Sequence, residues 1–434
     1  MEFGRGIFTR FVLIVLFSAC GYCSDCMWDK DKDFPRYPPL ILDSSFEFVL
    51  PVEENGNRVV RLLCGVSHEC VVSTVSSRRL ALGEIVTLAC PGDELENLHL
   101  VEAKARCLED GLLMIEDSVW DMASLGCGDD VKEMILRDQG ACGAGDIGVL
   151  HEIGFEVLSA ERFKKVLRVC FDPTSETTLY TEHLIHGASI AAKDIDSSRP
   201  SFKTSTGFFS VSMSSVYSQN SQLELMIKLL GDEDLAHQII DTHKQLYFAK
   251  GHMSPDADFV IMANQDATYY YINAVPQWQA FNNGNWKYLE FAARDLAEKK
   301  RRDLRVYSGG WGVLELDDIN GNPVEVFLGL AQEKKVVPAP AVTWKFRSHR
   351  GPFYRIQVVH DEVTNCAAAI VGVNNPHLTS APSTLCEDLC SSLQWIDFDV
   401  ADLEHGYTYC CSVADLRAAV PHVPDLGEVC LLTE

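Results

Sequence analysis

The chain has 434 residues, of which 47% are hydrophobic, and its formal net charge is −25 at pH 7. Such an acidic balance argues against a nucleic acid as ligand if the charge is evenly spread. The charge is not evenly spread, because residues 171–365 hold 19 Lys and Arg against 24 Asp and Glu, a net charge of −5. Basic residues also cluster there, at 299–302 and from Lys345 to Arg355, and these clusters are candidates for contacts to a polyanion backbone.

The first residues have the pattern of a secretory signal. Arg5 and Arg10 precede an apolar run from Phe11 to Ala19, and small residues follow. We expect residues 1–23 to be a cleaved signal peptide and the mature protein to be extracellular. A signal anchor is the alternative, but the run is short for a membrane span and no later segment approaches that length.

The placement of cysteines agrees with an oxidising compartment. Of 16 cysteines, two leave with the signal, eight lie between Cys26 and Cys170, six lie between Cys366 and Cys430, and residues 171–365 have none. An even number in each block predicts disulfides that close within each block. The bridges would then staple the flanks and leave the middle of the chain to its own packing.

Two features of the second cysteine block concern its pairing. Cys386 and Cys390 could instead contribute to a zinc site, but secretion favours disulfides and no second pair of ligands is evident. Cys410 and Cys411 are adjacent in sequence, so we expect each of them to have a separate partner.

Residues 24–150 carry no motif that we can connect to chemistry. Short apolar runs alternate there with Gly, Pro and acidic turns, which predicts a small disulfide-linked β domain. Its acidic surface could dock on the rest of the chain, face a partner or aid solubility, and we favour solubility. Residues 151–434 would form a second domain that ends in a Cys-rich cap.

One later stretch holds most of the side chains that could perform catalysis. A Lys-Gly-His turn ends at His252, and a helix with a basic last turn is predicted over residues 282–302. In such a helix Glu290 and Arg294 are i, i+4 neighbours, and Asn282 lies about 80° around the axis from Glu290. All three side chains could therefore face one cleft.

A histidine, an amide oxygen, a carboxylate and cations around one cleft suit metal-assisted hydrolysis of phosphodiesters. Mg²⁺ prefers oxygen ligands and keeps most of its waters, so a single amide oxygen can be its direct protein contact. An imidazole that titrates near neutrality can take a proton from the attacking water. The metal and the cations offset the charge that develops on the phosphorus oxygens and the leaving group.

This stretch resembles the DNA/RNA non-specific endonucleases of the ββα-metal type, particularly the secreted nucleases of insects and other arthropods that degrade double-stranded RNA. The matching segments are KGHMSPDADF, NAVPQWQAFNNGNW and the Leu-Glu and Arg of LEFAAR, in the family's order and spacing. The likeness runs from about Val169 to the C-terminus. It implies an endonuclease dependent on Mg²⁺, with Mn²⁺ as the alternative, that acts on DNA and RNA without sequence preference. It implies no membrane partner and leaves the oligomeric state open.

The resemblance also implies roles for individual residues. His252 matches the general base, Asn282 the direct Mg²⁺ ligand and Glu290 the carboxylate that holds waters of the metal shell. Arg294 matches an arginine near the scissile phosphate, and Asn273 an asparagine of the active-site neighbourhood.

Substrate contacts and departures from the family pattern complete the predicted site. Arg199 matches an upstream arginine that contacts phosphate, and Lys345 either reaches the substrate or has a structural role beside Trp344. The family's Asp-Arg-Gly-His becomes Ala249 and Lys250 followed by Gly-His. Lys250 keeps the charge for clamping phosphate but lacks the planar fork of arginine, so turnover should suffer more than binding.

The expected fold is α+β, with a ββα-metal nuclease core around a central, mainly antiparallel sheet, preceded by the small β domain. Strands are predicted at residues 178–185 and 269–272. His183 and His186 have the spacing of a helical metal pair, but their strand context and the lack of a third ligand argue against one.

Three functional hypotheses are consistent with these observations. The first is a secreted, metal-dependent endonuclease for DNA and RNA. The second is a nucleic-acid-binding protein whose catalysis is attenuated through Ala249 and Lys250. The third is an unrelated secreted protein in which His252 and Asn282 have only structural roles. The joint motif match favours the endonuclease, since a binding protein has no need for the base, the metal ligand and the carboxylate together.

Overall fold

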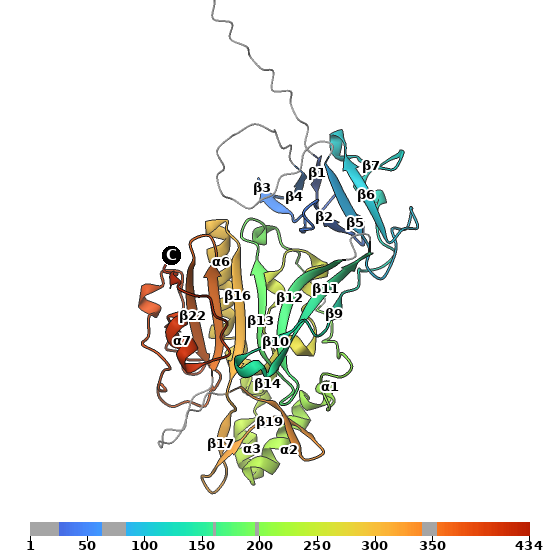
Figure 1. The fold of residues 1–434 in the computed structure, drawn as a ribbon. Coiled ribbons are helices and arrows are strands. Elements are labelled where there is room, and N and C mark those ends of the chain that lie inside the picture. The colour runs from blue at the N-terminus through green and yellow to red at the C-terminus, as the bar shows by residue number, and fades with distance from the viewer. Residues whose placement is uncertain (1–25, 63–83, 159–161, 196–198, 341–353) are drawn as a thin grey trace, which may run out of the picture.

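One large, mainly antiparallel sheet organises the protein in the computed structural model, which describes residues 26–62, 84–158, 162–195, 199–340 and 354–434 (Figure 1). Its strands follow the order β10, β11, β12, β13, β16, β21, β22, β23, with β9 beside β11 and β24 beside β22. They are β9 (Met134–Leu136), β10 (Ala141–Cys142), β11 (Gly148–Val157), β12 (Arg162–Asp172), β13 (Thr177–Ile185), β16 (Leu304–Trp311), β21 (Tyr354–Asp361), β22 (Cys366–Val373), β23 (Thr408–Cys411) and β24 (Cys430–Leu431). The predicted fold class and the strand at 178–185 are confirmed.

Between β13 and β16 the chain leaves the sheet and later returns to the same place. Ile185 at the end of β13 pairs with Leu304 at the start of β16. The elements of this excursion are α1 (Met213–Val216), α2 (Gln219–Leu230), α3 (Glu233–Ile239), β14 (Phe248–His252), α4 (Met262–Asp266), β15 (Ala274–Trp278), α5 (Gln279–Asn282) and α6 (Asn285–Lys300). Strands β14 and β15 pair antiparallel and precede α6, so this part of the chain contains a strand-strand-helix unit.

Strand β22 shows how the sheet is covered. Its sequence, CAAAIVGV, is apolar throughout instead of alternating, and every residue after Cys366 is buried. Phe281 of α5 packs over Gly372 so closely that a Cβ there would collide with its ring. The helix α7 (Val413–Ala419) also contacts β22, and in Figure 1 it lies in front of the sheet while α6 lies behind. Beyond β16 the chain forms two small hairpins, β17 (Glu315–Asp317) with β18 (Pro323–Glu325) and β19 (Phe327–Ala331) with β20 (Lys334–Pro338).

Two predicted elements of the excursion are wrong. Residues 269–272 do not form a strand, because pairing with β14 begins only at Ala274 and the residues before it form a buried 3₁₀ turn. The helix predicted over 282–302 is broken at Gly284, whose φ of −96° and ψ of −127° separate α5 from α6. Asn282 and Glu290 therefore do not share one helix, and their angular spacing cannot be taken from helical geometry.

The N-terminal region consists mainly of β-strands, and it packs on the large sheet. Its two sheets contain β1 (Cys26–Asp29), β3 (Val52–Glu54) and β4 (Asn57–Leu62), and β2 (Leu40–Leu42), β5 (Ile85–Ala89), β6 (Glu102–Cys107), β7 (Leu113–Ile115) and β8 (Ser118–Trp120). One apolar core runs from Leu88 through Phe155 and Phe171 to Tyr270. The domain therefore packs on the rest of the chain through apolar residues, and the role of its acidic surface stays a prediction. The boundary near residue 150 stays a prediction, although β9 and β10 before it already pair with the large sheet.

Among the described residues the disulfides close within the two predicted blocks, and Cys64 and Cys70 of the first block lie outside those residues. They are Cys26–Cys107, Cys90–Cys127, Cys142–Cys170, Cys366–Cys430, Cys386–Cys411 and Cys390–Cys410. The adjacent Cys410 and Cys411 have separate partners, as expected. The zinc alternative at Cys386 and Cys390 is wrong, because both sulfurs are oxidised. Asp388, Cys390 and Cys410 come close together, but two of these three are bridged.

Some predictions concern residues that the structure does not describe. The signal peptide, Lys345 and Trp344 lie outside the described residues. Within the described ranges, no helix combines the length and the apolar character that crossing a bilayer requires.

Candidate active site

The Lys-Gly-His turn forms the end of a strand. Lys250 of β14 lies opposite Pro276, and His252 lies opposite Ala274. Glycine is required at position 251 because a Cβ there would collide with the side-chain oxygen of Gln277. His252 is therefore the last residue of a strand that is tightly packed behind it.

One backbone carbonyl orients His252. Its Nε2 lies 3.1 Å from the oxygen of Thr268, and because a carbonyl only accepts, Nε2 carries the proton and Nδ1 keeps its lone pair. The rings of Phe202 and Tyr269 flank the imidazole, each with its centroid 4.8 Å away. Burial lowers the pKa of His252 to about 4, against the opposing effect of Asp256. The imidazole is therefore neutral at pH 7, which is the form a general base requires.

Asn273 fixes the loop that supplies this carbonyl. Its buried Nδ2 donates to the oxygens of Thr268 at 2.8 Å and Ser254 at 2.9 Å, while its Oδ1 accepts from the Ser254 N–H at 2.9 Å. The Thr268 carbonyl thus accepts from both Asn273 and His252. Asn273 is therefore linked to His252 through their shared acceptor.

Two cations predicted to meet phosphate lie around His252. Arg199 is 79% exposed, with its Nε 3.9 Å from Asp256. The Lys250 ammonium lies 5.6 Å from the ring centroid of Phe202 and 5.9 Å from that of Tyr271. Among the described residues Lys250 forms no ion pair. Both charges therefore remain available to a ligand.

Asn282 lies at the break between α5 and α6. Its Nδ2 is 3.5 Å from Gln279 Oε1, and its Oδ1 accepts no hydrogen bond from the described residues. The break is anchored by the C-terminal cap, because Asn285 Nδ2 donates to the carbonyls of Asp399 at 2.7 Å and Gly406 at 2.8 Å. The cap thus positions the amide that is predicted to hold the metal.

Glu290 lies on α6, in a setting that opposes its ionisation. Burial raises its pKa to about 7, Asp258 adds to this rise, and Arg294 and Arg355 oppose it. A bound cation would act in the same direction as the two arginines and favour the carboxylate form.

Arg294 belongs to a buried ion-pair network that sequence reasoning missed. Its Nη1 lies 2.6 Å from Asp258 Oδ1, and the other oxygen of Asp258 lies 2.8 Å from His183 Nε2. Arg294 is only 9% exposed, and the other two side chains are fully buried. Asp258 stands within the matching KGHMSPDADF segment, which was the available signal. His183 and His186 have different partners, since His183 Nε2 is bonded to Asp258 and His186 Nδ1 to Asp303.

Arg355 is a second residue whose place the sequence did not reveal. The basic cluster in which it stands was a candidate for backbone contacts, but Arg355 is 2% exposed beneath β14 and donates through Nη1 to Gln277. Its guanidinium lies 4.4 Å from the Trp286 ring centroid, and its Nε and Nη2 have no partner among the described residues. Burial lowers the pKa of Arg355 to about 9, and its charge acts on Glu290. Its effect on the site is therefore electrostatic.

A base, an amide oxygen, a carboxylate and several cations thus surround a strand-strand-helix unit, and the comparisons agree with this arrangement. The model of the DNA/RNA non-specific endonuclease family matches residues 148–416, more than half of the chain. The chain belongs to the DNA/RNA non-specific endonuclease family. It is accordingly a nuclease of a metal-dependent class that acts on nucleic acids. The match begins before the predicted limit at Val169 and leaves the N-terminal β domain outside.

Similar proteins include salivary proteins of two insects. The chain is 28% identical over 343 residues to a salivary endonuclease of Lutzomyia longipalpis, covering 77% of this chain and 73% of that protein. It is 25% identical over 290 residues to salivary protein Tsal1 of Glossina morsitans morsitans, covering 66% and 67%. A chain in the EndoG/EndoGI complex shares 19% identity at a TM-score of 0.32, over 51% of this chain and 76% of that chain. That score is too low to place individual residues.

Proposed function

We propose that this family member is a secreted, Mg²⁺-dependent, sugar-non-specific endonuclease that hydrolyses DNA and RNA, including double-stranded RNA, with His252 as the general base. The observation that carries the proposal is the state of His252, which is neutral at pH 7, has its protonated Nε2 bound to Thr268 and accepts no hydrogen bond at Nδ1 from the described residues. A water held near Nδ1 can lose a proton to it as the water oxygen attacks phosphorus.

The donor set suits a hard cation. Asn282 offers an amide oxygen with no hydrogen-bond donor from the described residues, and Glu290 offers a carboxylate that can hold metal-bound waters. No thiol or imidazole pair is present among these donors, so Mg²⁺ or Mn²⁺ fits better than zinc. When bound, the cation would offset charge on the phosphate oxygens and on the leaving oxygen.

The remaining charges would bind the phosphate. Lys250 and Arg199 are the accessible cations, while Arg294 is a guanidinium that Asp258 holds in place close to Glu290. Contacts to phosphate and sugar carry no sequence information, which supports cleavage without sequence preference. The P–O bond to the 3′ oxygen breaks, so that the products carry 5′-phosphate and 3′-hydroxyl ends, as the family resemblance implies.

Three observations support an extracellular setting: the predicted signal peptide, the six disulfides among the described residues, and the relatives that are named as salivary proteins. Disulfides of this number persist in oxidising compartments and not in the cytosol.

The proposal is tested by digestion of plasmid DNA and duplex RNA with the purified protein, in Mg²⁺, in chelator, and after His252→Ala. His99→Ala is the matched control, because His99 is an exposed histidine of the N-terminal β domain. We expect cleavage that requires metal, survives in the control and is lost in His252→Ala. Retardation of nucleic acid by the wild type without nicking would instead establish the attenuated binder, in which Lys250 and Ala249 have weakened turnover. Cleavage that persists in His252→Ala would show that another group is the base.

A further inference from the structure

Three consecutive residues of the loop that follows His252 each contact one cation. These contacts join Asp256 Oδ2 to Arg199 Nε at 3.9 Å, the Ala257 carbonyl to Lys193 Nζ at 3.4 Å, and Asp258 Oδ1 to Arg294 Nη1 at 2.6 Å. We call the three side chains the cation row. Lys193 contacts the middle residue of the loop segment, and the other members of the row are the two arginines of the proposed phosphate site.

Lys193 differs from the two arginines in its lack of a carboxylate partner. Each carboxylate nearby has other partners: Asp256 has Arg199 and Tyr269, Asp258 has Arg294 and His183, and Asp194 has Lys30 and Arg58. Among the residues that the structure describes, Lys193 itself forms no ion pair. The cation row therefore has three positive charges for the two carboxylates that it contacts.

The surroundings of the Lys193 ammonium make this unpaired charge costly. The side chain is half-buried, and burial lowers the pKa of its amine. Arg294 and Arg199 lower this pKa further, while Asp258 and Asp256 oppose them. The one hydrogen bond that the ammonium donates to a described residue goes to a neutral carbonyl at 3.4 Å, which exceeds the usual length. An anionic oxygen is therefore the partner that this position lacks.

The backbone holds Lys193 beside the loop. Its N–H donates to the Ile190 carbonyl at 3.3 Å, and the N–H of the next residue, Asp194, donates to the Val260 carbonyl at 2.7 Å. Val260 lies in the same loop as Ala257, so the side chain of Lys193 starts from a fixed point. Holding its ammonium near a ligand therefore costs less conformational entropy than it would for a lysine on a free surface segment.

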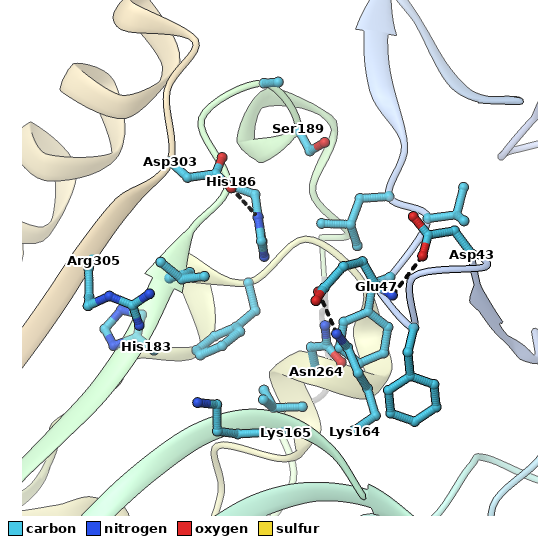
Figure 2. A pocket seen from close by; sticks show the side chains of 18 of the residues that line it. Asp43, Glu47, Lys164, Lys165, His183, His186, Ser189, Asn264, Asp303 and Arg305 are labelled. Atoms are coloured by element: carbon cyan, nitrogen blue, oxygen red, sulfur yellow. Dashed lines mark hydrogen bonds and ion pairs between the residues drawn. The ribbon is translucent and has the colours of Figure 1, made fainter. Parts of the chain in front are cut away.

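Cations elsewhere in the same part of the molecule are neutralised. Figure 2 shows a cavity of about 620 Å³ between the N-terminal region and the large sheet, lined by side chains of both charge signs. The lysines and the arginine labelled there have carboxylate partners, in the pairs Lys164–Glu47 at 2.6 Å, Lys165–Glu152 at 4.0 Å and Arg305–Glu362 at 2.8 Å. That cavity therefore selects no class of ligand, whereas the cation row has a charge left for an anion.

We propose that Lys193 is a substrate-binding residue whose ammonium contacts a backbone phosphate of the nucleic acid together with Arg199 and Arg294. The inference rests on the proposed nuclease function and adds a phosphate contact to it. A phosphate oxygen offsets the third positive charge of the row and replaces the distant Ala257 carbonyl as the partner of the ammonium. Because the contact is to phosphate, it increases affinity for any base sequence, in DNA and in RNA.

This role has a signature that a structural role does not share. Loss of one charge-assisted contact should weaken binding of duplex DNA about tenfold. It should also make the slope of log Kd against log salt concentration shallower by about 0.9, because one phosphate fewer is neutralised. If the ammonium served only to hold the Ala257 carbonyl, its removal would lower the stability of the fold and leave the salt slope unchanged.

The experiment measures binding of a fluorescein-labelled duplex DNA to the full-length protein in chelator, by anisotropy at several salt concentrations. Lys193→Met removes the charge, and Lys193→Arg keeps it. Lys244→Met is the matched control, because Lys244 is a lysine of the same excursion that is 75% exposed and pairs with Asp241. We expect weaker binding and a shallower slope in Lys193→Met alone, with Lys193→Arg close to wild type and no loss of stability in denaturant unfolding.

Several results would overturn the proposal. One is a folded Lys193→Met protein with the affinity and salt slope of wild type. Another is an equal change in Lys244→Met, which would show an effect of net charge and not of a contact. A third is reduced stability of Lys193→Met without a change in slope, which would assign the lysine to the loop.

Binding in chelator also separates this inference from the proposed function. A protein that binds duplex DNA through Lys193 but cleaves nothing when Mg²⁺ is added would refute the nuclease proposal and support the phosphate contact. Normal cleavage by a Lys193→Met protein that also binds like wild type would refute the contact and leave the nuclease proposal intact.

Discussion

Replacing Asn273 by alanine should lower both stability and turnover, because its buried amide holds the loop in place and also holds the Thr268 carbonyl that orients His252. The change removes three hydrogen bonds of 2.8 to 2.9 Å, two to Ser254 and one to Thr268, from a fully buried side chain. At about 1 kcal/mol for each net hydrogen bond, we expect a loss of about 3 kcal/mol in the free energy of unfolding. The Thr268 carbonyl keeps its bonds to His252 and to the Tyr270 N–H, but the loop that orients the imidazole loses its side-chain anchor.

The catalytic effect should fall on kcat. Small displacements of a catalytic group cost up to about a hundredfold in rate, and Asn273 has no exposed surface with which to touch phosphate. We therefore expect kcat to fall between about tenfold and a hundredfold while KM changes little. Denaturant unfolding measures the stability, and steady-state cleavage of a fluorescent duplex measures the rates.

Asn264→Ala provides the matched control. Asn264 is also a buried asparagine of this loop, but its Oδ1 has no partner among the described residues. It should cost less stability than Asn273→Ala and should leave kcat near the wild-type value. If Asn273→Ala retains full kcat despite reduced stability, the carbonyl does not position His252, and equal stability losses in the two variants would refute the hydrogen-bond estimate.

The remaining predictions concern charge. Lys250→Arg restores the planar fork and should raise kcat more than it lowers KM, as cleavage kinetics would show. Asp258→Asn leaves Arg294 and His183 without their buried carboxylate and should cost about 3 to 5 kcal/mol in denaturant unfolding, whereas a change under 1 kcal/mol would contradict the network's role. Glu290 has a pKa raised from 4.5 to about 7, so the unfolded chain releases this proton first, and stability falls as the pH rises from 4.5 to about 7 and stays lowered above it. In chelator, Glu290→Gln should therefore stabilise the protein more at pH 8 than at pH 5, and the reverse order would show that the carboxylate is not desolvated.

The sequence predicted those features whose causes lie close together in the chain. The alternation in residues 178–185 marks β13 directly, and the cysteine blocks predicted where the bridges close. The order of the KGH, NNGNW and LEFAAR segments pointed to the family without any tertiary information. Local patterns such as these survive folding because neighbouring residues determine them.

The features that the sequence did not predict depend on contacts with residues far away in the chain. The helix break at Gly284 depends on the C-terminal cap, whose His405 carbonyl accepts from the Asn285 N–H at 3.0 Å. Arg355 is buried because its strand is covered on both faces, which a basic cluster in sequence does not reveal. Asp258 acquires its role only when His183 and Arg294 converge on it. In each case the determining contact spans tens of residues or more, beyond the reach of periodicity and propensity.

The pairing of Ile185 with Leu304 means that the chain enters and leaves the excursion at one point of the sheet. Strands β13 and β16 flank this segment, residues 186–303. All six disulfides of the described residues lie outside it. Insertions, deletions or exchanges within residues 186–303 can therefore occur without shifting the hydrogen-bond register of the sheet. The scaffold and the chemistry of this nuclease can diversify separately, and a chimaera that receives a relative's segment between these two strands should still fold its sheet.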